Sequence, residues 1–186
     1  MRFAFYDRLP AESKRTYRKS DAIRRVELPD AAPMVLLARA IETALEGAER
    51  AAVERACQAF VDAVNARLAT PPIRVRVLER RPANSGGELQ GLYEPDEVTG
   101  GLARITVWMR TAQREQVVRF RTFLRTVIHE VCHHLDYELY GLHETFHTEG
   151  FYARESALMR ELMGEPVTAS APADAPPKSP RASRGS

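Results

Sequence analysis

Two histidines with a glutamate between them are the residues of this sequence best suited to chemistry. His129, Glu130 and His133 lie in the sequence His-Glu-Val-Cys-His, so the histidines are four residues apart. On a helix this spacing places both imidazoles on one face, one turn apart, where they can bind the same ion. Zinc suits imidazole ligands and lowers the pKa of bound water to about 7. We therefore expect Zn²⁺ at His129 and His133.

Glu130 has a different expected role from the histidines. Its side chain projects about 100° around the helix from His129, so the carboxylate can reach a water on the metal without becoming a ligand. It can take a proton as hydroxide attacks a carbonyl and return that proton to the leaving amine. The sequence therefore predicts Glu130 as the general base of a hydrolase.

A catalytic zinc normally has three protein ligands and one open position, so one ligand is still to be found. The candidates after the motif are His143, His147 and Glu155, and spacing alone leaves all three open. The metzincin pattern needs glycine and histidine where Asp136 and Leu139 stand, which excludes that class.

The segment resembles the HExxH zinc metallopeptidases, or zincins, and its compact layout is similar to SprT-like and related minimal zincins. In those groups a third histidine follows the motif and precedes an aromatic residue on a helix. His147 lies 14 residues after His133, and Phe151 follows four residues later. The resemblance covers roughly residues 100–163. It implies His129, His133 and His147 as zinc ligands and a peptide or protein as substrate.

Hydrophobic spacing predicts the elements that position these residues. We expect an active-site helix over 114–140, a last helix over 149–163, two helices between 30 and 70 that divide near Gly47, and strands at 73–78, 89–93 and 103–109. The predicted fold is an α+β zincin-like domain with a small, mostly antiparallel sheet and a helical N-terminal region. It would form one domain over 1–164, with sheet and active-site helices over 73–163 and a disordered tail over 165–186.

Several residues near the motif have competing interpretations. Tyr137, Tyr140, Tyr152 and Arg154 are candidate donors to a developing oxyanion. Asp136 fits either a hydrogen-bond acceptor for a ligating imidazole or a plain surface carboxylate. Elsewhere in this region, we interpret His134 as a packing residue off the ligand face, and Arg121 and Arg125 as a solvated basic face.

Composition sets limits on localisation and partners. The 186 residues carry a net charge of +2, which compels no nucleic-acid binding, so such a partner is possible but unsupported. Cys57 and Cys132 cannot form a disulfide framework, and no stretch approaches the ~20 apolar residues of a membrane span. We expect a cytoplasmic protein without membrane association, and the sequence does not indicate its oligomeric state.

The predicted function is zinc-dependent peptide hydrolysis, with two alternatives. In the first, zinc links helices in a non-catalytic interaction module. In the second, the protein is a DNA-associated protease of the SprT type that uses its basic N-terminal segment and arginine-rich helix. By the same resemblance, the strand at 103–109 is expected to be the sheet edge that binds extended substrate, through pairing of backbones.

Overall fold

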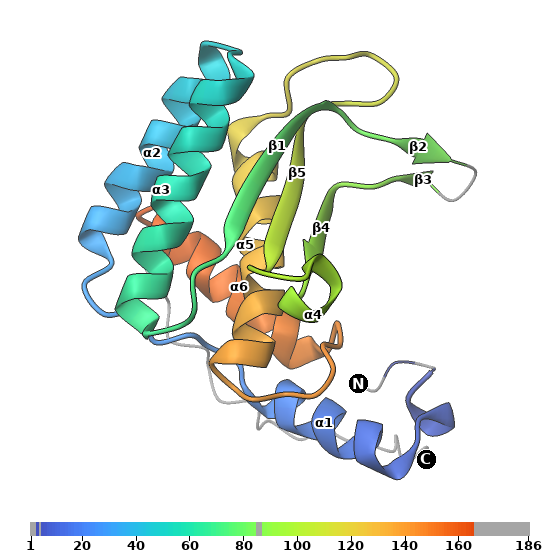
Figure 1. Ribbon diagram of the computed structural model, residues 1–186. Helices are drawn as coiled ribbons and strands as arrows, with labels where there is room; N and C mark the ends of the chain where they lie inside the picture. Colours follow the sequence, from blue (N-terminus) through green and yellow to red (C-terminus); the bar gives the residue numbers. More distant parts are fainter. Residues whose placement is uncertain (1–2, 4, 85–86, 166–186) are drawn as a thin grey trace, which may run out of the picture.

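The computed structural model describes residues 3, 5–84 and 87–165, and the described residues form an α+β fold (Figure 1). The elements follow along the chain as η1 (Tyr6–Arg8), α1 (Ala11–Ala22), α2 (Ala32–Glu46), α3 (Arg50–Leu68), β1 (Arg74–Arg80), β2 (Ala83–Asn84), β3 (Gly87–Glu88), β4 (Gly91–Glu94), α4 (Asp96–Thr99), β5 (Arg104–Arg110), α5 (Phe120–Glu138) and α6 (Glu149–Leu162). None of the described helices is long and apolar enough to cross a membrane.

The main sheet has three strands in the order β1-β5-β4, and β2 pairs with β3 in a separate two-stranded ribbon. β1 runs parallel to β5, with Val75 opposite Ile105, whereas β4 runs antiparallel to β5, with Gly91 opposite Val107. The sheet is therefore mixed, where the sequence predicted a mostly antiparallel one. Alternation of apolar and polar residues shows that a strand is half buried, but it contains no information on the direction of the neighbouring strand.

β5 is the central strand, so the prediction that 103–109 forms the substrate-binding edge is wrong. Both sides of β5 are already paired, and its residues from Ile105 to Met109 are all buried. Such a continuous buried run is typical of a strand covered on both faces. The edge strand on the side of the histidine motif is β4.

In the view of Figure 1, α5 lies behind the sheet, whereas α2 and α3 lie beside β1. α5 packs against β4 and β5, α3 packs along β1, and α2 packs on α3. The core consists of aliphatic and aromatic residues from these elements, among them Val53, Phe60, Val61, Val75, Val77, Ile105, Val107, Leu124, Val127, Ile128, Val131 and Leu135. This packing fixes α5, the helix that carries the histidine motif, against the sheet.

The predicted division between the two N-terminal helices is confirmed, since α2 ends at Glu46 and α3 begins at Arg50. The Glu49 side chain accepts hydrogen bonds from the first free N–H groups of α3. α1 was not predicted, because its sequence is polar and its few apolar residues have no clear helical period. It packs against α6, at the lower end of the molecule in Figure 1.

The helix predicted over 114–140, which corresponds to α5, begins later than expected, at Phe120. The preceding segment turns back on β5 instead, with the Val118 N–H donating to the Met109 carbonyl. α6 matches its prediction closely, and the Thr148 hydroxyl caps it by accepting from the Phe151 N–H. Of the predicted tail, positions 166–186 lie outside the described residues, whereas Glu165 pairs with Arg121.

Candidate metal centre

Three histidines converge on one point. The Nε2 atoms of His129 and His147 are 3.0 Å apart, those of His133 and His129 are 3.2 Å apart, and those of His147 and His133 are 3.1 Å apart. Two nitrogens that bind one tetrahedral zinc at 2.0–2.1 Å would be roughly 3.3–3.4 Å apart. The three imidazoles are thus arranged as the ligands of one small cation would be.

This trio is the ligand set that the family resemblance implied. His129 and His133 lie on successive turns of α5, and His147 lies in the loop between α5 and α6. His143, in the same loop, is exposed and does not belong to the cluster. Glu155 is also outside the trio and contacts the side of one ligand instead.

Glu155 contacts the Nδ1 side of the His129 imidazole, away from the other two histidines. Its Oε2 lies 2.9 Å from His129 Nδ1, and its Oε1 accepts a hydrogen bond of 2.7 Å from Arg125. Although burial opposes the charged form, the hydrogen bonds from His129 and Arg125 lower the pKa of Glu155. The carboxylate is therefore an acceptor, and His129 donates from Nδ1. In the neutral imidazole the lone pair of His129 is then on Nε2, which faces the other histidines.

His133 is also bonded through Nδ1, which lies 2.7 Å from the Thr145 hydroxyl. Burial, followed by the neighbouring His129, lowers the pKa of His133 to about 3, so its imidazole is neutral. With Nδ1 bonded to Thr145, its Nε2 is the second nitrogen directed at the cluster.

These hydrogen bonds test whether the site suits a cation. The Nε2 atoms of His129 and His133 each carry a lone pair when Nδ1 is the donor, yet they lie only 3.2 Å apart. Two acceptors so close, with no proton to share, repel each other unless a positive charge lies between them. A donor set of three imidazoles suits zinc, so the residues fit this metal.

Phe151 forms the apolar base of the cluster. Its ring centroid is 5.0 Å from that of His129, 4.8 Å from that of His133 and 5.1 Å from that of His147, and its side chain is completely buried. The ring restrains all three imidazoles at once and keeps one side of the cluster dry. The opposite side is the one from which water and a substrate can approach.

Glu130 lies beside the cluster and points toward the sheet. Only 5% of its surface is exposed, and burial raises its pKa to about 7. The neighbouring strand β4 leaves room for it only because residue 91 is a glycine, since a Cβ on Gly91 would lie 2.2 Å from Glu130 Oε1. The backbone of β4 therefore approaches the Glu130 carboxylate as closely as a backbone can.

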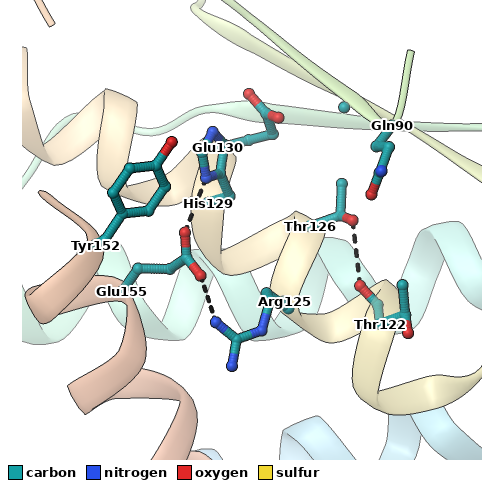
Figure 2. A pocket seen from close by; sticks show the side chains of 9 residues that line it. Gln90, Thr122, Arg125, Thr126, His129, Glu130, Tyr152 and Glu155 are labelled. Atoms are coloured by element: carbon teal, nitrogen blue, oxygen red, sulfur yellow. Dashed lines mark hydrogen bonds and ion pairs between the residues drawn. The ribbon is translucent and has the colours of Figure 1, made fainter. Parts of the chain in front are cut away.

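A cleft of about 440 Å³ opens next to His129 and Glu130. Figure 2 shows the Tyr152 ring and the Glu130 side chain on opposite sides of His129. The walls come from β4 and its approach, from α5 and from α6, and consist of Gln90, Gly91, Thr122, Arg125, Thr126, His129, Glu130, Tyr152 and Glu155. One member of the trio, His129, thus lies at the wall of a hollow large enough to hold part of a peptide.

The candidate oxyanion donors differ in position. Arg154 is completely buried and bonded within the protein, so its prediction as a donor is wrong. Tyr137 stacks on Tyr93, and Tyr140 packs beneath the Arg154 guanidinium. Tyr152 is 43% exposed, lines the cleft and stacks on the third histidine of the trio, with ring centroids 5.8 Å apart. Tyr152 alone of the four lines this cleft.

Other neighbours also have defined places. His134 is buried, as expected of a packing residue, with Nε2 3.1 Å from the Pro71 carbonyl. Asp136 is completely buried, which corrects the interpretation of a surface carboxylate and leaves the hydrogen-bonding one. Sequence reasoning missed Gly91 and Thr145. For Gly91, a glycine at the start of a strand could have indicated a close approach to another segment. Nothing in the neighbouring sequence indicated a role for Thr145.

Comparison of the chain with protein-family models, with curated proteins and with solved structures finds no match. The function must therefore be argued from the chemistry of the site.

Proposed function

We propose that this protein is a zinc-dependent peptidase that hydrolyses peptide bonds of a peptide or protein substrate. The observation that carries the proposal is the convergence of three imidazole Nε2 atoms beside a buried glutamate and an open cleft. Histidine ligands for a metal with a non-ligating carboxylate next to them supply both the metal site and the general base of metal-assisted hydrolysis.

His129, His133 and His147 would hold the metal through Nε2. A zinc ion held there would supply Lewis acidity for the scissile carbonyl and would lower the pKa of a water molecule to about 7. Glu130 takes the proton from the attacking water and delivers it to the leaving nitrogen. Its pKa of about 7 suits a group that must both accept and release a proton near neutral pH.

Tyr152 is the residue best placed to stabilise the oxyanion that forms at the attacked carbonyl. Its ring is held by stacking against His147 and by an edge contact with Phe151, and its side chain lines the cleft. A phenol can donate a hydrogen bond to a developing negative charge without itself being charged. Glu130 and Tyr152 would thus act on the substrate from opposite sides of His129 (Figure 2).

Strand β4 would bind the substrate backbone in place of the strand first expected. It lies at the edge of the sheet, and Gly91 in it touches both Glu130 and the cleft. An extended peptide can add to such an edge by backbone hydrogen bonds, which gives affinity largely independent of side chains. The peptide would then cross the cleft next to the general base.

Neither alternative function gains specific support. A non-catalytic zinc link between helices does not require a buried glutamate with a raised pKa or a cleft at the metal. For binding to DNA, the basic stripe of α5 would have to be free, yet Arg121 pairs with Glu165 and Arg125 pairs with Glu155. A cytoplasmic location remains part of the proposal.

The decisive experiment compares wild type with Glu130→Gln. We expect about one zinc per chain in both proteins and a loss of roughly 10²–10⁴-fold in kcat/KM in the variant, because the amide cannot accept the proton. Peptide-library cleavage with and without a chelator measures the activity, and metal analysis measures the zinc. Equal cleavage by the two proteins would show that Glu130 is not the base. Zinc without any cleavage by wild type would favour the non-catalytic module.

A second experiment tests the ligand set. His147→Ala should weaken zinc binding by more than the roughly 10–100-fold that loss of an outer hydrogen-bond partner costs, because a ligand itself is removed. Glu155→Gln should weaken it less, and His143→Ala, at an exposed position outside the cluster, is the matched control. A larger loss at Glu155 than at His147 would reverse the assignment.

A further inference from the structure

A chain of hydrogen bonds runs from His133 into the protein. His133 Nδ1 lies 2.7 Å from Thr145 Oγ1, and the Thr145 hydroxyl donates to Asp136 Oδ2 at 2.8 Å. The other oxygen of Asp136 accepts from Nη2 of Arg154. Asp136 and Arg154 are both completely buried, so water does not compete for these bonds.

The chemistry of the partners fixes the direction of each bond. Asp136 faces a guanidinium, so its carboxylate accepts and does not donate. Thr145 has a single hydroxyl proton, and that proton is directed to Asp136. The hydroxyl oxygen must therefore accept from His133, which places the imidazole proton on Nδ1 and leaves Nε2 as a lone pair.

The far end of this chain is anchored on α1. Arg154 Nη1 donates to the carbonyls of Ser20 and Ile23, both at 3.0 Å, and Nη2 donates to the Ser20 hydroxyl at 3.1 Å. These carbonyls belong to the C-terminal end of α1, where the helix dipole favours a positive charge. Arg154 is thus held on one side by α1 and on the other by Asp136.

We propose that Thr145, Asp136 and Arg154 are positioning residues that fix His133 in the tautomer and orientation that a metal requires. The proposal rests on the proposed zinc site but not on peptidase activity. His129 has a carboxylate in direct contact, whereas His133 reaches its carboxylate through a hydroxyl. The Thr145 hydroxyl is therefore the point at which the support of one ligand can be removed while every charged group stays in place.

The experiment removes that hydroxyl with little change of shape. Thr145→Val replaces it by a methyl group and Thr145→Ser retains it. Thr43→Val is a matched control, since the Thr43 hydroxyl donates to the Arg39 carbonyl on the exposed face of α2. Zinc affinity is measured by competition with a chelator, and the visible spectrum of the Co²⁺ form reports ligand geometry. Circular dichroism checks folding, and Thr145→Ala substitutes for the valine variant if that variant does not fold.

We expect Thr145→Val to weaken zinc binding by about 10–100-fold and to change the Co²⁺ spectrum, because His133 is then free to rotate or to carry its proton on Nε2. Thr145→Ser and Thr43→Val should resemble wild type in both measurements. Affinity of Thr145→Val within about threefold of wild type would overturn the proposal. So would an equal loss in Thr145→Ser, since the contact would then be steric.

The outcomes separate this proposal from the proposed function. If wild type binds zinc and the Thr145 series behaves as expected, but no peptide is cleaved, the positioning role stands and the peptidase proposal fails. If wild type binds neither Zn²⁺ nor Co²⁺, there is no bound metal for which His133 must be positioned. The positioning proposal and the peptidase proposal then both fail. If wild type cleaves peptides and Thr145→Val retains full zinc affinity, the positioning role alone is wrong.

Discussion

The two edge strands of the three-stranded sheet, β1 and β4, differ in what lies beside their outer backbone groups. At the β1 edge, side chains of α3 occupy the backbone groups that another strand would use. The Val75 N–H donates to Gln58 at 2.8 Å, and the Val77 N–H donates to Glu54 at 2.9 Å. Arg50 and Gln58 also donate to carbonyls of this edge. A helix lying alongside thus replaces a neighbouring strand.

At the opposite edge, β4 has no further strand beside it among the described residues. Among the described residues it pairs with β5 alone, and its first residue, Gly91, packs against Glu130 at the wall of the cleft. An open sheet edge recruits any extended chain that reaches it. Because one edge is covered and the other lies beside Glu130, strand addition would be confined to the place where the proposed hydrolysis occurs.

The largest effect is expected from closing the gap between β4 and α5. In Gly91→Ala the new Cβ would lie 2.2 Å from Glu130 Oε1 and 2.8 Å from Thr126 Cγ2, so the carboxylate must move away from its place. We expect kcat/KM to fall by about a hundredfold with zinc content unchanged. Gly101→Ala, where a Cβ meets nothing within 4 Å, is the control. Activity of Gly91→Ala near that of Gly101→Ala would show that β4 does not constrain the base.

A smaller effect should come from the substrate side. If a peptide pairs with β4, methylation of a peptide N–H that faces the strand removes one hydrogen bond worth ~0.5–1.5 kcal/mol, which raises KM by about 2- to 12-fold. Successive N–H groups of a strand point in opposite directions, so a methyl scan along the peptide should alternate between affected and unaffected positions. A scan without this alternation would remove β4 as the docking edge.

Substitutions that disturb the β1 edge should leave catalysis unchanged. Glu54→Ala leaves the Val77 N–H without its acceptor and should lower the free energy of unfolding by ~1 kcal/mol, measured by denaturant titration, with kcat/KM unchanged. Glu54→Gln, which keeps an acceptor oxygen, should lose less. A fall in kcat/KM in the alanine variant would mean that the two edges are not functionally separate.

The sequence predicted best what a single element determines. One helix fixes the relation of His129 to His133, so the i, i+4 spacing was sufficient for that pair. His147 comes from a loop, and only the family resemblance selected it over His143 and Glu155. The structure joins His147 to the pair and gives Glu155 the supporting position.

What the sequence did not predict depends on contacts between distant segments. The parallel pairing of β1 with β5 and the docking of α1 on α6 leave no local periodic signal. Arg154 was named as an oxyanion donor because of its charge, whereas its partners on α1 lie more than 130 positions away in the chain. Thr145 has a role only because Asp136 and His133 lie on either side of it.

The close crossing of α1 and α6 has a consequence for how the protein is made. A Cβ on Gly150 would lie 2.3 Å from the Asp21 carbonyl oxygen, and the Gly150 N–H donates to the Asp21 side chain, 129 positions away. At roughly 5–20 residues per second, the ribosome completes this interval in roughly 6–26 s. Until then α1 has no surface to dock on, and Arg154 has not been synthesised. α1 is therefore translated well before it can reach its native place, and the support behind His133 is completed only after α6 has been made.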